Sequence, residues 1–127
     1  MTTEQNKQRI TEYIKAVHVA IKPMELLDRY ISDADMELKG HIQVFEAGIP
    51  CYDFIPEDII ADGNKVMVRF RVKGQHTGDL FGCPPTGNHV NFTGVIVYEL
   101  ADGMIVNHWM EVDSVGMMQQ ISTAVMA

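Results

Sequence analysis

The chain has 127 residues, a length that fits one folded domain around one hydrophobic core. Hydrophobic residues make up 46% of it and charged residues 21%, as in globular proteins, and no apolar run approaches the roughly 20 residues of a membrane-spanning helix. The net charge of −7, with scattered Lys and Arg residues, argues against binding to nucleic acid. Residues 1–9 are polar and do not resemble a secretory signal, so a cytoplasmic location is expected.

Cys51 and Cys83 are the two cysteines, and neither has a Cys or His partner at the spacing of a zinc site. We therefore expect no disulfide framework and no structural metal, and a reducing compartment fits this pattern.

The first part of the chain shows apolar residues at spacings of three and four, which predicts one-sided helices. The first helix should end before Pro23, which can open a second, short helix. A third should be capped by Ser32 or Asp33 and closed by Gly48 and Pro50. The apolar positions of the three helices are, in order, Ile10, Tyr13, Ile14, Val17 and Ile21; Met24, Leu27 and Ile31; and Leu38, Ile42, Phe45 and Ile49. Each of these helices needs a sheet to cover its apolar side.

The second part of the chain has the pattern of strands. A turn signal at 62–64 precedes residues 65–73, where apolar and polar residues alternate, and this predicts a hairpin. Residues 90–100 and 104–112 predict a second hairpin, and residues 74–87, rich in Gly and Pro, a long loop. A short helix or turn is expected at 114–121. Helices first and strands afterwards predict an α+β fold with a curved antiparallel sheet, in a single domain over residues 1–127.

Several short motifs in the second half occur in a characteristic order. They are IIADGNKVMVR at 59–69, GQHTG at 74–78, GCPPTG at 82–87, DGMIVNHW at 102–109, an Asp at 113 and QQ at 119–120. With these motifs the chain resembles the SnoaL-like polyketide cyclases of the nuclear transport factor two-like superfamily, over about residues 38–121. The resemblance implies a cone-shaped α+β barrel, in which a curved mixed or antiparallel sheet and N-terminal helices enclose an apolar pocket.

The resemblance also implies an activity. Members of this family close a ring by intramolecular aldol condensation, by acid–base catalysis without a metal or organic cofactor. A small apolar substrate with a carbonyl or ester group is therefore expected, together with a homo-oligomer, a dimer or tetramer, that associates through the sheet. Two alternatives stay open: a non-catalytic small-molecule-binding protein, and an isomerase or epoxide hydrolase on the same fold.

Asp113 is the first candidate for a catalytic residue. It lies four positions after Trp109, the spacing of the family's acid/base aspartate. The two-residue period of a strand places Trp109, Glu111 and Asp113 on one face, where apolar walls would raise the pKa of a carboxyl group toward neutral pH. The alternative is that Asp113 only caps the helix that follows it.

His76 is the second candidate, because it matches the family histidine that lines the cavity. A neutral imidazole there could stabilise an enolate, whereas the alternative is a loop histidine satisfied by backbone groups. The expected substrate-binding residues are Trp109, Glu111, Phe70, His18 and Asn91.

Arg69 and His108 have open roles. Arg69 lies seven positions before His76, so a regular strand would point the two to opposite faces unless Gly74 introduces a bulge. Arg69 then either pairs with an acid or supports an oligomer on the outside, or takes part in catalysis. His108 is out of phase with Trp109, which favours a packed or interface histidine.

Overall fold

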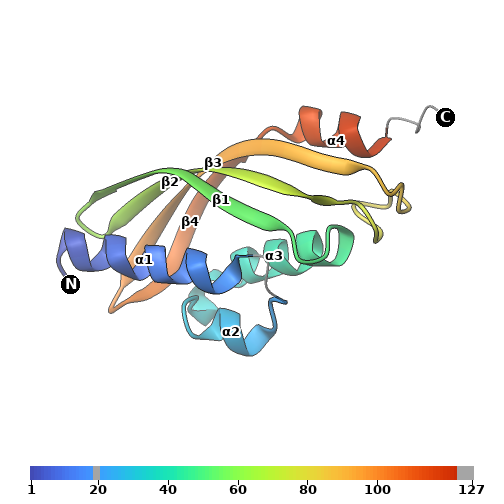
Figure 1. The fold of residues 1–127 in the computed structure, drawn as a ribbon. Helices are drawn as coiled ribbons and strands as arrows, with labels where there is room; N and C mark the ends of the chain where they lie inside the picture. Colours follow the sequence, from blue (N-terminus) through green and yellow to red (C-terminus); the bar gives the residue numbers. More distant parts are fainter. Residues whose placement is uncertain (19–20, 123–127) are drawn as a thin grey trace.

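The computed structural model describes residues 1–18 and 21–122. The elements are, in chain order, α1 (Thr3–Val17), α2 (Met24–Asp28), a short 3-10 turn (Asp33–Asp35), α3 (Met36–Gly48), β1 (Asp53–Asp62), β2 (Lys65–Gln75), β3 (His89–Ala101), β4 (Met104–Val112) and α4 (Ser114–Ser122). The expected α+β architecture is therefore confirmed. Figure 1 shows α1, α2 and α3 below one face of the sheet and α4 beside one end of β3.

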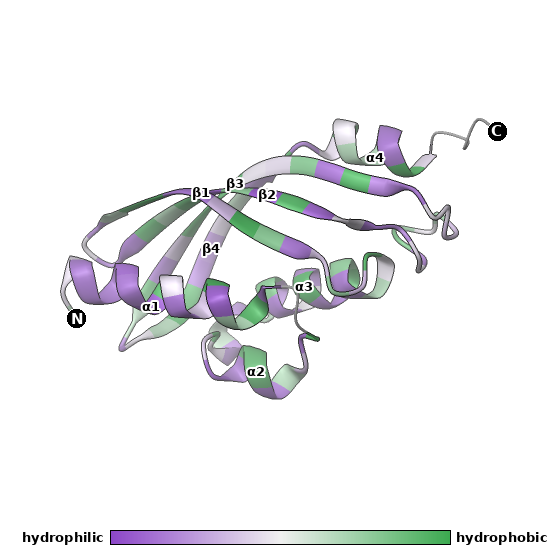
Figure 2. Cartoon of the chain, viewed as in Figure 1, coloured by the Kyte–Doolittle hydropathy of each residue, from purple (hydrophilic) through white to green (hydrophobic). Residues whose placement is uncertain are grey.

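The sheet is antiparallel throughout, in the order β1-β2-β3-β4. Alternate residues of each strand point to opposite faces, and the apolar ones colour the strands in short bands in Figure 2. On β2 the buried positions are the four predicted from alternation, Val66, Val68, Phe70 and Val72. We call the face that carries them, turned toward α1 and α3, the inner face, and the opposite one the outer face.

The helices cover the inner face with the apolar sides predicted for them. Ile10, Tyr13, Ile14 and Val17 of α1 are buried, but Ile21 lies beyond the helix and is 76% exposed. The N-terminus of α3 is capped by Asp35, whose Oδ1 accepts a hydrogen bond from the backbone N–H of Leu38 at 3.2 Å. The predicted cap at Ser32 or Asp33 is therefore two or three residues too early. Ser32 caps the preceding 3-10 turn instead.

The strands agree with the predicted pattern except at two points. β1 extends back from the predicted turn at 62–64 as far as Asp53, although Pro56 lies inside it. Pro56 is tolerated because β1 is an edge strand and its pairing with β2 shifts register between Pro56 and Asp58. The bulge considered at Gly74 is absent from the continuous β2–β3 pairing, where Gly74 lies opposite Val90. Among the described residues, no helix combines the length and apolarity required to cross a membrane.

Candidate functional site

A pocket lies between the inner face of the sheet and helices α1 and α3. Its unfilled space is about 600 Å³ when the open mouth is included, but the centre of a water molecule can occupy only about 50 Å³ of it. The apolar walls come from every strand and from both helices: Val17, Leu38, Ile42, Phe45, Phe54, Phe70, Val72, Phe92, Ile96, Met110 and Val112. The space is therefore narrow and suits a small or flat molecule.

Aromatic rings form much of the wall. Phe54 and Phe70 stack with centroids 4.5 Å apart and planes inclined by 24°. Phe45 faces Phe92 at 6.2 Å and meets Tyr52 edge to face at 6.4 Å. Such rings offer flat apolar surfaces against which a planar ligand can stack.

Five polar side chains interrupt the apolar lining: Tyr13, Lys22, His41, Tyr52 and Tyr98. Within the described part of the chain, no Asp or Glu lines this pocket. The Lys22 ammonium is buried, 2.9 Å from Glu46 Oε2 and 4.0 Å from the centre of the Tyr52 ring. The positive charge beside the pocket is therefore balanced by a carboxylate and an aromatic face.

The three tyrosine hydroxyls of the pocket are held in their neutral form. Burial raises the pKa of Tyr13, Tyr52 and Tyr98, and electrostatic interactions with neighbouring groups raise each of them further. The hydroxyls of Tyr13 and Tyr98 hydrogen bond to each other, which raises the pKa of Tyr13 and lowers that of Tyr98. One of the two hydroxyls donates this bond, and the other keeps its hydrogen for a further partner.

A second polar group lies at the side of the pocket where α3 meets β4. His108 of β4 and Asp35 are both buried, with Nδ1 and Oδ2 2.7 Å apart. An ionised carboxylate can only accept, so Nδ1 donates this bond and the contact does not use Nε2. We call Asp35, Glu37, His41 and His108 the histidine cluster.

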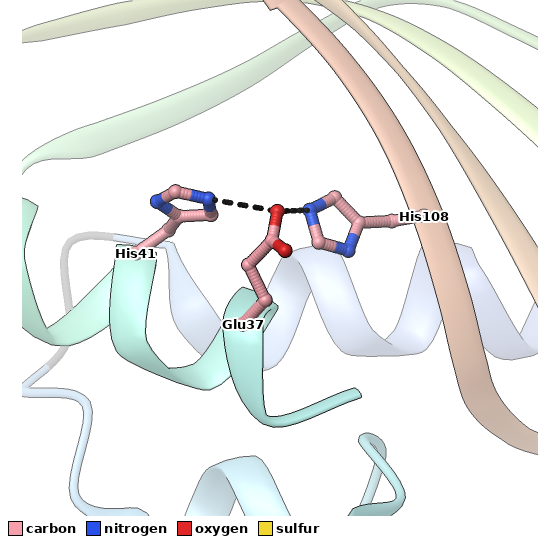
Figure 3. A group of neighbouring side chains, drawn as sticks. All are labelled: Glu37, His41 and His108. Atoms are coloured by element: carbon pink, nitrogen blue, oxygen red, sulfur yellow. Dashed lines mark hydrogen bonds and ion pairs between the residues drawn. The ribbon is translucent and has the colours of Figure 1, made fainter. Parts of the chain in front are cut away.

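Glu37 and His41 complete this cluster from successive turns of α3. The Glu37 carboxylate oxygen Oε1 is 3.4 Å from His41 Nε2 and 3.9 Å from His108 Nε2, and Figure 3 shows it between the two rings. The rings meet edge to face with centroids 5.9 Å apart. His41 also lines the pocket, so the histidine cluster adjoins it.

The expectation that Asp113, Trp109 and Glu111 face the pocket is wrong. In the β3–β4 pairing, Tyr98 of the inner face lies opposite His108, and Ile96 opposite Met110. The inner positions of β4 are therefore 108, 110 and 112. Asp113 is exposed, and its Oδ1 accepts a hydrogen bond from the backbone N–H of Gly116 at 2.9 Å, so the helix-cap alternative describes its position.

His76 is buried but does not line the pocket, contrary to expectation. Its backbone N–H donates to the carbonyl of Asn88 and its carbonyl accepts from Gly87, both at 2.8 Å. The ring Nδ1 lies 3.0 Å from the hydroxyl oxygen of Thr86, and in the described structure Nε2 has no hydrogen-bond partner. His76 thereby joins the two ends of the loop after β2.

Of the other residues expected to bind the substrate, only some line the pocket. Phe70 lines the pocket, as expected. His18 is exposed and does not line the pocket, and its Nε2 is 3.2 Å from Asp53 Oδ1. Asn91 is exposed outside it, and its Oδ1 accepts a hydrogen bond from Arg71. Arg69 lies on the outer face, with Nη2 2.7 Å from Asp58 Oδ2. It therefore pairs with an acid and lies outside the pocket.

His108 is the packed histidine that its phase predicted, but the sequence analysis missed Asp35, Glu37 and His41. One signal was available, since Glu37 and His41 are four positions apart and share a helix face. The pairing of Asp35 with His108 joins residues 73 positions apart and leaves no local pattern.

Comparison with known proteins gives consistent matches. The family model described as SnoaL-like polyketide cyclase matches residues 28–121. A SnoaL-like protein of known structure from Jannaschia sp. CCS1 is 19% identical, with 96% of this chain and 94% of that chain covered and a TM-score of 0.86. A SnoaL-like polyketide cyclase from Agrobacterium tumefaciens is 17% identical over 96% and 100% of the two chains, with a TM-score of 0.74. TsrD from Streptomyces laurentii is 16% identical over 91% and 96%, with a TM-score of 0.78. Among curated proteins, none is a significant match.

Proposed function

Because the chain belongs to the SnoaL-like polyketide cyclase family, we propose that it is an acid–base enzyme acting on a small, largely apolar carbonyl compound. The proposed reaction is an intramolecular aldol ring closure or a related carbon-acid reaction carried out by side chains. The observation that supports it best is an imidazole, His41, in a largely apolar pocket wall that also contains three tyrosines.

His41 is the proposed proton carrier. In the first step its ring nitrogen removes a proton from the carbon next to the substrate carbonyl, which leaves an enolate and an imidazolium. The enolate carbon then attacks a second carbonyl of the same molecule, forming the carbon–carbon bond of the ring. The new alkoxide takes the proton back from His41, so the cycle ends with the imidazole neutral. The Glu37 carboxylate, 3.4 Å from His41 Nε2, can hold the ring in position.

Tyr98 is the proposed donor to the enolate oxygen. Its hydroxyl shares a hydrogen bond with that of Tyr13, and its raised pKa keeps the hydroxyl hydrogen in place at neutral pH. A donor fixed in apolar surroundings stabilises developing negative charge more strongly than water does. Phe54 and Phe70, stacked in the same wall, would hold a planar substrate against these groups.

The test compares His41→Gln with Asp113→Asn. We expect wild-type protein in D₂O to speed deuterium exchange into the methyl group of acetophenone, measured by NMR. His41→Gln keeps a polar side chain but cannot carry a proton, so the catalysed exchange should fall by about 100-fold or more. Asp113→Asn keeps a good helix cap and lies outside the pocket, so it should exchange like wild type. Unchanged exchange in His41→Gln would disprove the assignment.

A second candidate function is non-catalytic binding of a small apolar molecule. The narrow space and the lack of a carboxylate in the described pocket lining favour it. Acetophenone that binds to wild-type protein without any faster exchange would support this candidate over the enzyme.

A further inference from the structure

The histidine cluster has the composition of a metal centre. We propose that Glu37, His41 and His108 bind one divalent transition-metal ion, with Zn²⁺ as the best fit. One ligand atom from each residue, two imidazole nitrogens and a carboxylate oxygen, lies within 4.8 Å of the others. Figure 3 shows the three side chains converging from α3 and β4.

The distances fit such an ion after small side-chain movements. Bonds of about 2.0–2.1 Å in a tetrahedral zinc site hold neighbouring ligand atoms roughly 3.3 Å apart. The Glu37 oxygen is already 3.4 Å from His41 Nε2 and 3.9 Å from His108 Nε2. Glu37 and His41 are largely on the surface, so both can rotate at little cost, whereas His108 is held in place.

His108 is arranged as metal-binding histidines commonly are. Such a histidine donates its other ring nitrogen to a carboxylate, which fixes the ring and leaves one lone pair for the ion. Asp35 supplies this carboxylate, 2.7 Å from Nδ1, and is itself fixed as the cap of α3. His108 Nε2 is 3.9 Å from Glu37 Oε1, which is beyond hydrogen-bond distance, so the geometry leaves this nitrogen available to an ion.

The donor set selects the kind of ion. Mg²⁺ and Ca²⁺ prefer oxygen ligands, whereas two imidazoles with one carboxylate suit Zn²⁺ and its neighbours. Three protein ligands leave one position of a tetrahedral ion for water or another molecule. Of the three ligands, His41 also lines the pocket.

This metal site does not depend on the proposed function, but both use the His41 ring. An imidazole bound to a divalent ion accepts a proton less readily. We therefore expect Zn²⁺ to suppress the acid–base reaction where that reaction occurs, while metal binding itself is measured without any substrate.

The test uses the full chain, freed of metal by dialysis against a chelator. Titration calorimetry with ZnCl₂ should show one ion per chain, and Co²⁺ should give the strong visible absorption of a tetrahedral nitrogen- and oxygen-ligated ion. Glu37→Gln and His41→Gln each remove a ligand at the surface and should weaken binding about 10-fold or more. The matched controls Glu25→Gln and His89→Gln change an exposed Glu and an exposed His elsewhere and should bind as wild type does.

A third variant, His108→Gln, tests the buried ligand, with circular dichroism to verify folding. If this variant does not fold, the two surface variants still decide the outcome. Wild-type protein that binds no Zn²⁺, or Glu37→Gln and His41→Gln that bind as tightly as the controls, would overturn the proposal.

Discussion

Asp113 stands at the junction of β4 and α4, where its carboxylate accepts a hydrogen bond from the backbone N–H of Gly116. We expect Asp113→Ala to lower the free energy of unfolding by about 1 kcal/mol, because the first turn of α4 loses its cap. Urea denaturation would measure this loss, and the Asp113→Asn variant should show little of it. A large loss of ligand binding in Asp113→Ala with α4 intact would contradict this structural role.

The position of Trp109 explains why the sequence pattern wrongly predicted Asp113 in the pocket. Trp109 is the largest apolar side chain of β4, and its size favours an inward position, yet it is 50% exposed on the outer face. When a strand carries apolar residues on both faces, the alternating pattern does not show which face is buried. The pairing of Tyr98 with His108 shows which face of β4 is turned inward. This pairing joins two strands that meet only in the folded sheet.

Close packing of β3 against β2 and β4 shapes the pocket. A Cβ atom on Gly94 would lie 2.6 Å from Cζ of Phe70 and 2.7 Å from the carbonyl oxygen of Glu111. Both distances are too short, so a larger residue must displace a pocket wall or the backbone of β4.

We expect Gly94→Ala to cost about 1–3 kcal/mol in the free energy of unfolding, as is usual for overpacking. The matched control is Gly40→Ala in α3, where a Cβ would meet nothing within 4 Å. That change should stabilise the protein by roughly 0.5–1 kcal/mol, because alanine favours a helix over glycine. Chemical denaturation of both variants checks the prediction, and equal effects of the same sign would refute it.

Most elements could be predicted from the sequence because their patterns are local. β4 has the predicted bounds, 104–112, and the three N-terminal helices follow their apolar spacing. The start of β1 could not be predicted, since Pro56 argues against a strand unless the strand is known to be at an edge. Of the candidate site, Phe70 was predicted in the pocket, whereas the histidine cluster joins three segments and required the fold.

The outer face of the whole sheet carries a row of apolar side chains in register across all four strands: Ile60, Met67, Val97 and Trp109. Ile60 and Trp109 are 59% and 50% exposed. A continuous apolar row is typical of a surface that another protein covers.

We therefore expect the homo-oligomer implied by the family resemblance to associate through this row. Light scattering after gel filtration should give a mass above the 14.3 kDa of one chain. Trp109→Arg should reduce it to that of a monomer, because it places a charge in the apolar row. The exposed change Lys73→Arg serves as the control. A wild-type protein that runs as a monomer at high concentration would rule out this interface.

The position of Trp109 also has a practical consequence for spectroscopy. It is the sole tryptophan of the sequence, and the sheet separates it from the pocket, which contains three of the four tyrosines. Indole emission should therefore shift when copies of the chain meet but not when a compound enters the cavity, whereas tyrosine emission should respond to the compound. One unlabelled sample can in this way report both events at separate wavelengths.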